Sequence, residues 1–228
     1  MALPTSLENE PWVIVKTTLP AMPLPPNSGR KVIHTARLTL KPCSQDDLAE
    51  LFELRSQPEV MVWTAAGRPD KSQDESQAKL SLFIPPNDVK TFNYSIFWRE
   101  TGQFIGMGGC HMFQGEFGWP EIGYMLRKEF WGRGLATEFI RAYLDSYESL
   151  PREEAELKVM KCSIPEGQGE SGAKVDELLT GVVEGNNDRS FNVVRKADFE
   201  IFVHYLEPSD DGEPVVLAGV RRFVKAKA

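Results

Sequence analysis

The most informative segment of this chain reads Glu121-Ile-Gly-Tyr-Met-Leu-Arg-Lys-Glu-Phe-Trp-Gly-Arg-Gly-Leu-Ala-Thr-Glu-Phe-Ile-Arg-Ala-Tyr-Leu144. Its pattern predicts a short strand, a tight turn containing Gly132 and Gly134, and an amphipathic helix that begins within the glycine pair. The glycines let the backbone bring several N–H groups round one small volume, and the helix adds its unpaired N-terminal amides and the positive end of its dipole. Such an arrangement binds phosphate oxygens. The helix stripe expected to be buried consists of Leu135, Phe139, Ala142 and Tyr143.

In its sequence, the segment resembles the GCN5-related N-acetyltransferase (GNAT) superfamily, in which the glycine turn holds the pyrophosphate of acetyl-CoA. The sequence is most similar to the branch that includes the ribosomal-protein-alanine N-acetyltransferases. Two further segments fit that branch. His34-Thr-Ala-Arg-Leu-Thr-Leu-Lys-Pro42 resembles its opening strand, and Asn187-Asp-Arg-Ser190 followed by Val193-Val-Arg-Lys-Ala-Asp-Phe199 resembles its last characteristic block.

The resemblance implies an α/β (α+β) GNAT fold, with a mixed, mostly antiparallel sheet of roughly six to seven strands flanked by about four helices. It also implies an acetyl-CoA-dependent N-acetyltransferase that moves an acetyl group to a primary amine, either a protein N-terminus or a small-molecule amine. The transfer would be direct, in a ternary complex. The alternative is a non-catalytic acyl-CoA-binding or regulatory relative with the same fold.

The chain of 228 residues is long enough for one well-buried domain with extensions. We predict an N-terminal arm at residues 1–30 and a GNAT domain over residues 31–228. The arm is rich in proline around one β-like run, Trp12–Val15, so it either adds an edge strand or forms a poorly ordered tail. A stretch near residues 150–177 is acidic and carries the glycine cluster Glu166–Gly172. We expect a mobile insertion there, because few of its residues could bury apolar surface.

Two capping patterns predict the first helices. Ser44 with Asp47 three residues on, and Ser72 with Glu75 three residues on, each precede a helical pattern. The apolar loop Val60–Gly67 between them either lines the acceptor pocket, as the resemblance implies, or plugs a small core of its own. A last short helix is predicted at Ser190–Lys196. The predicted strands are Val32–Pro42, Phe92–Trp98 (half-buried), Phe104–Phe113, Glu121–Leu126 and Leu178–Glu184, with a closing hairpin of Phe199–Leu206 and Val215–Val224 around Asp210–Gly212.

Composition limits the partners and the compartment. Hydrophobic residues make up 41% and charged residues 26%, as in ordinary globular proteins. No apolar run approaches the ~20 residues of a membrane span, and the start lacks a secretory signal, so we expect a cytoplasmic protein without a membrane partner. The net charge of −7 without a basic stripe argues against nucleic acid and is compatible with a cationic amine as acceptor, whose identity the sequence leaves open. We expect a monomer or homodimer.

The cysteines and histidines predict neither disulfides nor a metal site. Three widely spaced cysteines fit reduced thiols, and three histidines far apart lack the spacing of metal ligands.

Acetyl transfer needs a general base, because an alkyl amine with a pKa near ~10 must lose its proton before it attacks. Glu121 is our first candidate, since the resemblance places it where histone-type members of the superfamily carry a catalytic glutamate. The alternative is a structural carboxylate at a strand end. His111 is the second candidate, a titratable ring one strand away that could equally be a packed side chain.

The leaving thiolate needs a proton, and the tyrosine that supplies it in the superfamily maps to Val194, which cannot donate one. Ser190 is the nearest hydroxyl in the matching block. The resemblance implies that Asn187 and Ser190 lie against the pantetheine arm of the cofactor, and both could also cap a helix.

Two residues depart from the family pattern at turns. Glu129 stands where Gln or Arg is usual, so its carboxylate must point away from a pyrophosphate. Asp198 replaces a glycine, and Asp tolerates a left-handed backbone better than most residues. The cofactor-binding residues expected from the resemblance are Met125, Leu126, Trp131, Gly132, Arg133, Gly134, Leu135, Ala136, Thr137, Asn187 and Ser190.

Overall fold

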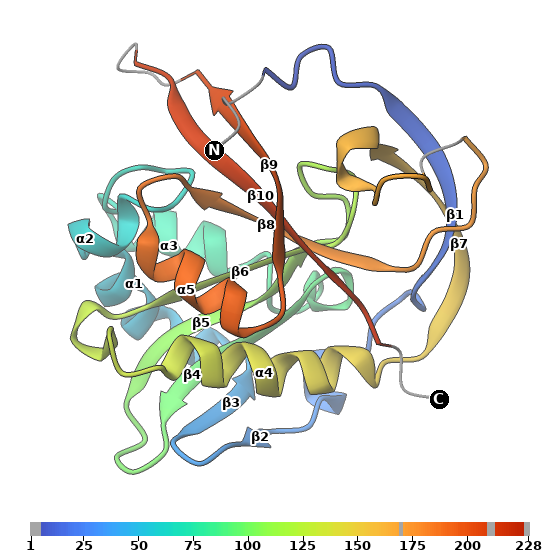
Figure 1. Cartoon of the computed structure of the whole chain (residues 1–228). Coiled ribbons are helices and arrows are strands. Elements are labelled where there is room, and N and C mark those ends of the chain that lie inside the picture. The colour runs from blue at the N-terminus through green and yellow to red at the C-terminus, as the bar shows by residue number, and fades with distance from the viewer. Residues whose placement is uncertain (1–5, 169–170, 209–212, 226–228) are drawn as a thin grey trace. The chain divides into compact units, whose positions relative to one another are not determined.

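A computed structural model describes residues 6–168, 171–208 and 213–225 (Figure 1). The chain divides into two compact units. The first comprises Met1–Ala21, Met112–Ile122 and Glu148–Ala228, and the second comprises Met22–His111 and Gly123–Tyr147. Each unit is described in turn.

The second unit is built on an antiparallel series of strands. In spatial order these are β2 (Ile33–His34), β3 (Leu38–Pro42), β4 (Phe92–Trp98), β5 (Phe104–Met112) and β6 (Glu121–Leu126).

The prediction that β4 is half-buried is wrong, because both of its faces are covered. Ser95 on one face donates a hydrogen bond of 2.6 Å to the carboxylate of Asp47, next to the first helix. Tyr94 on the other face contacts Tyr143 of α4 (Leu135–Glu148) edge to face, with ring centroids 6.4 Å apart. Each polar residue of the strand therefore needs a protein partner.

Three helices precede β4, namely α1 (Leu48–Arg55), α2 (Pro58–Met61) and α3 (Gln73–Leu80). The capping prediction for Ser44 is confirmed, since Ser44 and Asp47 form a reciprocal capping box. Ser72 does occupy the N-cap position of α3, but its side chain makes no capping hydrogen bond. Helix α2 was not predicted. It begins with Pro58, which is favourable at a first helical position, and it occupies the start of the apolar loop.

The first unit contains a separate antiparallel ribbon, β1 (Trp12–Pro20) paired with β7 (Arg152–Met160) along its whole length. The arm therefore contributes a strand rather than a tail in the part described.

Our reason for expecting a mobile insertion is wrong for part of residues 150–177, because several side chains of this stretch are buried. They join a core around Trp119, whose indole N–H donates to the Ser163 hydroxyl over 2.9 Å. The buried side chains of this stretch include Leu157, Val159, Met160, Ile164 and Val175.

The remaining elements of the first unit follow β7 in the chain. They are β8 (Leu178–Glu184), α5 (Asp188–Lys196), β9 (Glu200–Glu207) and β10 (Val215–Phe223). Strand β10 pairs antiparallel with both β8 and β9, which confirms the closing hairpin. The predicted turn at Asp210–Gly212 lies outside the described residues.

Strand β6 is divided between the two units after Ile122. Its first residue, Glu121, pairs in parallel with Thr180 of β8 within the first unit. The hydrogen-bonded order is β2-β3-β4-β5-β6-β8-β10-β9. The predicted mixed α/β class is confirmed. The described elements number eight strands in this sheet, two in the ribbon and five α-helices, slightly more than predicted. The predicted strand Val32–Pro42 is divided into β2 and β3, a strand in the arm was only one of two alternatives, and β7 and α2 were not predicted.

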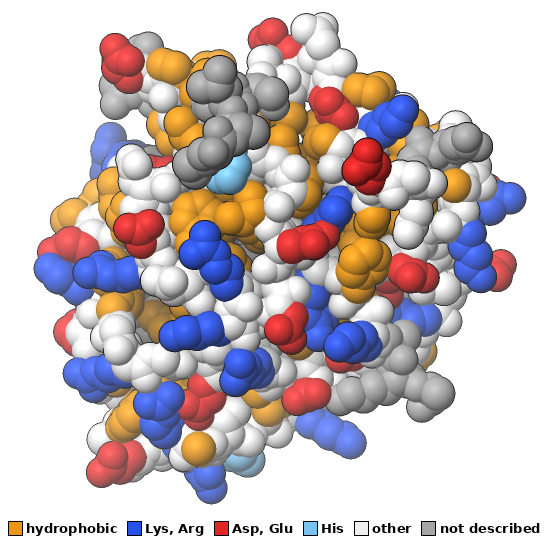
Figure 2. Space-filling view, viewed as in Figure 1, with side chains coloured by type: hydrophobic (Ala, Val, Ile, Leu, Met, Phe, Trp, Pro, Cys, Tyr) orange, Lys and Arg blue, Asp and Glu red, His pale blue; other side chains and the backbone are white. Residues whose placement is uncertain are grey.

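The surface and the helices bear on the expected partners. Acidic and basic side chains are interspersed over the face in view rather than gathered by sign (Figure 2). Among the described residues, no helix combines the length and the apolar character required to cross a bilayer. Cys43, Cys110 and Cys162 are not joined by a disulfide in the described structure.

Candidate functional site

The glycine turn of the second unit connects the end of β6 to α4. After Leu126 the chain makes a short 3₁₀ turn at Lys128–Phe130 and reaches Gly132 and Gly134, whose φ angles are +73° and +74°. Glycine alone adopts such angles without strain. The indole N–H of Trp131 donates to the carbonyl of Leu126 over 2.7 Å, which ties the entry of the turn to the strand.

The N–H groups of this turn are available to a ligand. Within the described part of the chain, the N–H groups of residues 132 to 137 donate to no protein acceptor. They are followed by a helix of 14 residues, whose dipole places partial positive charge at the same end. A Cβ atom at Gly132 would meet nothing within 4 Å, so the space above the turn is open. This geometry fits an anion such as a pyrophosphate.

Charged side chains surround the turn in a definite arrangement. The guanidinium of Arg133 lies 5.3 Å from the centroid of the Phe130 ring, and its side chain is exposed. The carboxylate of Glu129 accepts a hydrogen bond of 3.1 Å from Gln57, the N-cap residue of α2. Glu129 therefore has a protein partner of its own, and the cation nearest in sequence to the open N–H groups is Arg133.

His111, the second candidate base, lies in the second unit against β6. A Cβ atom at Gly123 would come within 3.3 Å of its ring, so a larger residue there would require the imidazole to shift slightly. Burial, with a smaller contribution from the charge of Lys79, lowers the pKa of His111 to about 4. The ring is therefore neutral at pH 7 and only a weak base.

Glu121 begins β6 in the first unit and is only 8% exposed. Its Oε2 accepts the N–H of Glu116 over 3.1 Å, and a Cβ atom at Gly115 would come within 2.5 Å of that oxygen. The loop therefore closes directly over the carboxylate. Burial raises the pKa of Glu121, and the charge of Glu116 adds to this effect. A raised pKa makes this carboxylate a stronger base than an exposed one.

Asn187 and Ser190 lie at the start of α5 in the first unit. The side chain of Asn187 accepts the N–H of Ser190 over 3.0 Å, so the capping role expected for Asn187 is confirmed. Val194 is buried on the same helix and offers no proton. Asp198 has a φ angle of +62°, which confirms that it takes the left-handed conformation of the glycine it replaces.

The two units hold different parts of the predicted site. The second unit brings together the turn, the end of β6 and His111, whereas the first unit holds Glu121, Asn187 and Ser190. In the second unit, Leu126 and Leu135 are buried core residues, so their side chains are not accessible to a ligand. Met125, Trp131, Ala136 and Thr137 are half-buried.

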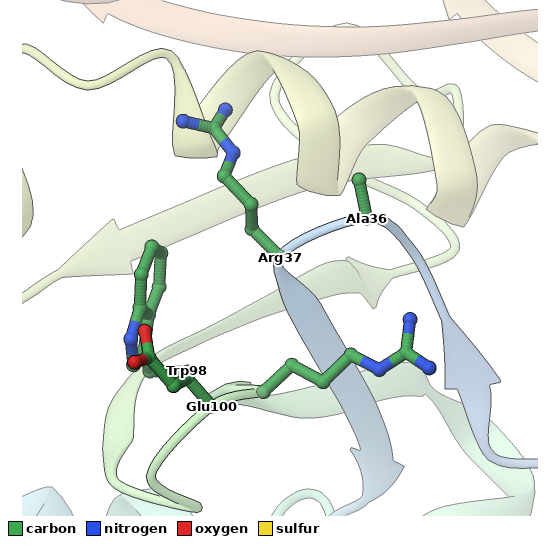
Figure 3. A pocket seen from close by; sticks show the side chains of 5 residues that line it. Ala36, Arg37, Trp98 and Glu100 are labelled. Carbon is green, nitrogen blue, oxygen red and sulfur yellow. The ribbon is translucent and has the colours of Figure 1, made fainter.

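An open pocket of about 310 Å³ adjoins the β2–β3 turn of the second unit (Figure 3). It is lined by Ala36, Arg37, Trp98, Arg99 and Glu100. Sequence reasoning assigned no role to Arg37, although it lies in the quoted opening-strand motif. Its partners, Arg133 and Glu138, lie about a hundred residues further along the chain, so no local pattern could reveal them. Among the described residues, no group of three or more His, Cys, Asp or Glu side chains could hold a metal ion.

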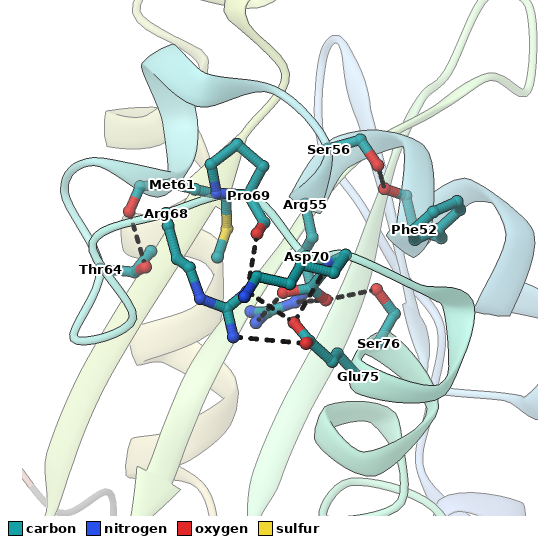
Figure 4. A network of polar contacts seen from close by, with 11 residues as sticks. Phe52, Arg55, Ser56, Met61, Thr64, Arg68, Pro69, Asp70, Glu75 and Ser76 are labelled. Carbon is teal, nitrogen blue, oxygen red and sulfur yellow. Dashed lines mark hydrogen bonds and ion pairs between the residues drawn. The ribbon is translucent and has the colours of Figure 1, made fainter.

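The loop that joins α1 to α3 is anchored by a buried ion pair (Figure 4). Arg55 donates two hydrogen bonds, of 2.6 and 2.8 Å, to the carboxylate of Asp70, and Ser76 donates a third of 2.6 Å. Burial opposes ionisation, but the hydrogen bonds from Arg55 and Ser76 outweigh it and lower the pKa of Asp70. Val62 and Trp63 are exposed within this loop.

Comparison with known proteins identifies the family. A family model described as an acetyltransferase (GNAT) domain matches residues 37–200. The chain is 33% identical over 134 residues to N-acetyltransferase p20 of Bacillus licheniformis, itself uncharacterized, covering 57% of this chain and 73% of that protein.

Solved structures show the same fold. The spermidine N-acetyltransferase from Vibrio cholerae, solved with CoA and spermine, has a TM-score of 0.61 at 16% identity and covers 84% of this chain and 98% of its own. The acetyl transferase from Salmonella typhimurium that modifies the N-terminal serine of ribosomal protein L7/L12 has a TM-score of 0.60 at 15% identity, with coverages of 86% and 100%. The resemblance to the GNAT superfamily stated from the sequence is confirmed.

Proposed function

Because the chain belongs to the GNAT acetyltransferase family, we propose that it transfers the acetyl group of acetyl-CoA to a primary amine in a ternary complex. The observation that carries this proposal is the run of open N–H groups at residues 132 to 137, at the positive end of α4. The thioester supplies an activated acetyl group, and the chain must bind it, orient it and manage protons.

The glycine turn would hold the pyrophosphate through its backbone. Residues 132 to 137 would donate their N–H groups to the phosphate oxygens, and Arg133 would add charge from its exposed position. Asn187 and Ser190 would hold the pantetheine arm in the ternary complex. Positioning of this kind supplies a large part of the acceleration of a two-substrate reaction.

Glu121 would accept the proton of the acceptor amine. Its raised pKa favours this role, because a general base is most effective when its pKa lies near the operating pH. His111 is the weaker candidate, since its lowered pKa reduces its basicity. Val194 leaves the thiolate without the usual acid. A thiol pKa near ~8.5 makes the thiolate a tolerable leaving group, and Ser190 or water would return the proton.

The proposed acceptor is either a small-molecule amine or a protein N-terminus. The relatives named above act on spermidine or on a protein N-terminus, so both kinds belong in the same screen. A non-catalytic acyl-CoA-binding protein is the second candidate, and Val194 is the observation that favours it.

The test is release of free CoA thiol. The protein is incubated with acetyl-CoA and a panel of polyamines and of peptides beginning with Ala or Ser, and free thiol is followed with a colorimetric reagent. We expect release that depends on both the protein and one of the amines. Calorimetric binding of acetyl-CoA without thiol release for any amine would support the non-catalytic reading instead.

A further inference from the structure

Arg37, the residue before β3, connects the glycine turn to the first turn of α4, and Figure 3 shows its side chain extending toward that helix. Its Nη1 donates to the carbonyl of Arg133 over 2.9 Å. Its Nε and Nη2 lie 2.8 and 2.7 Å from Oε2 of Glu138, on the first turn of the helix. One guanidinium therefore spans a carboxylate on the helix and a backbone carbonyl of the turn.

Glu138 is itself fixed from a second direction. Its Oε1 accepts the backbone N–H of Arg37 over 2.9 Å and the hydroxyl of Thr35 over 2.6 Å. Burial opposes ionisation, but the hydrogen bonds from Thr35 and Arg37 prevail and lower the pKa of Glu138. Both carboxylate oxygens are thus engaged, so Glu138 is a rigid anchor for the guanidinium.

The bond to Arg133 acts between the two glycines of the turn. Arg133 lies between Gly132 and Gly134, the two residues with positive φ angles. Glycines on both sides allow the intervening peptide groups to rotate, and fixing them on binding then costs conformational entropy, which lowers the affinity for the ligand. In a trans peptide the C=O of residue 133 and the N–H of residue 134 point in opposite directions. Holding the carbonyl of Arg133 therefore fixes the direction of the Gly134 N–H.

We propose that Arg37 is a positioning residue for acetyl-CoA: anchored by Glu138, it orients the Arg133–Gly134 peptide so that the Gly134 N–H meets the pyrophosphate. The inference rests on the proposed phosphate site at this turn. Preorganisation of this kind raises affinity by removing an ordering cost from the binding step. Its effect falls on cofactor binding and not on the chemical step.

A direct contact between the charge of Arg37 and the phosphates is the competing explanation, and Glu138 separates the two. Under positioning, Glu138→Gln weakens the anchor and lowers the affinity for acetyl-CoA. Under a direct charge contact, the same change removes a nearby negative charge and raises the affinity, because the carboxylate would repel the phosphates. The two roles predict effects of opposite sign.

The experiment measures acetyl-CoA affinity by calorimetry for Arg37→Gln, Arg37→Lys, Glu138→Gln and the double variant Arg37→Gln/Glu138→Gln. We expect affinity to fall about tenfold for Arg37→Gln, the loss of one hydrogen bond from a charged donor. Glu138→Gln should also lower the affinity for acetyl-CoA, and the double variant should bind acetyl-CoA no more weakly than Arg37→Gln alone. Arg37→Lys keeps the charge but cannot span both acceptors, so it should also bind more weakly. The KM for acetyl-CoA should rise in parallel, with kcat unchanged.

Arg68→Gln is the matched control. Arg68 is 47% exposed, compared with 42% for Arg37, and it also bonds a carboxylate, that of Glu75, and a backbone carbonyl, that of Pro69 (Figure 4). It should leave acetyl-CoA affinity unchanged.

Two results overturn the positioning role while leaving the proposed function intact. One is unchanged affinity in folded Arg37→Gln, and the other is tighter binding by Glu138→Gln. If Arg37→Gln does not fold, Arg37→Lys decides on the same criterion. A wild-type protein that binds no acetyl-CoA overturns the proposed function and this inference together.

Discussion

Replacing Gly134 by alanine tests the phosphate site directly. Gly134 has a φ angle of +74°, and a Cβ atom there would meet only the guanidinium of Arg37, at 3.7 Å. The methyl group would therefore fit against the protein, and the cost lies in the backbone. A left-handed conformation costs a residue other than glycine about 1–2 kcal/mol.

Where that cost is felt decides the outcome. The turn is exposed and its N–H groups lack protein partners, so in the free protein the strained residue can relax by giving up the one hydrogen bond that holds the Arg133 carbonyl, from Arg37. Binding then has to restore the angle, and the strain reappears as lost affinity. A loss of about 1.4 kcal/mol corresponds to tenfold weaker binding of acetyl-CoA.

Gly102 provides the control for this experiment. It also has a φ angle of +74°, and a Cβ atom there would meet nothing within 4 Å. Gly102→Ala therefore introduces the same strain into the β4–β5 hairpin, away from the turn. Both variants are compared by calorimetry with acetyl-CoA and by thermal unfolding. If folded Gly134→Ala binds within twofold of wild type, as Gly102→Ala should, the turn is not the phosphate site.

Three further changes test other parts of the site. Glu121→Gln should lower the rate by roughly 10²–10⁴, with a smaller loss at high pH, where more of the amine is already neutral. Because burial raises the pKa of Glu121, the variant should unfold at no lower temperature than wild type. A wild-type rate at neutral pH would exclude Glu121 as the base. Asp70→Asn leaves Arg55 buried without its counter-charge and should destabilise the protein by about 3 kcal/mol. Glu75→Gln, at an exposed pair, should destabilise it far less, and equal losses on urea unfolding would refute the role of the buried pair. His111 has a folded pKa of about 4, below its unfolded value, so the unfolded state binds more protons as pH falls below about 6.5. The free energy of unfolding should therefore fall by about 1.6 kcal/mol between pH 6.5 and pH 5 relative to His111→Gln, and a pH-independent difference between the two proteins would contradict the lowered pKa.

The sequence by itself determined the features whose physics is local. The glycine pair predicted the turn because few other residues adopt positive φ angles, and the same argument anticipated the left-handed Asp198. The pattern at Ser44 predicted a capping box because its hydrogen bonds join residues three apart. The alternation of apolar residues marked β4 as a strand, although it could not show that both faces are covered.

Only the tertiary structure decided the features that join distant parts of the chain. The partnership of Arg37 with Glu138 and the pairing of β1 with β7 depend on which elements meet, and short sequence patterns carry no information about that. The pKa shifts of Glu121 and His111 have the same origin. Each is dominated by burial, which neighbouring strands and loops impose on a side chain whose own sequence context is ordinary.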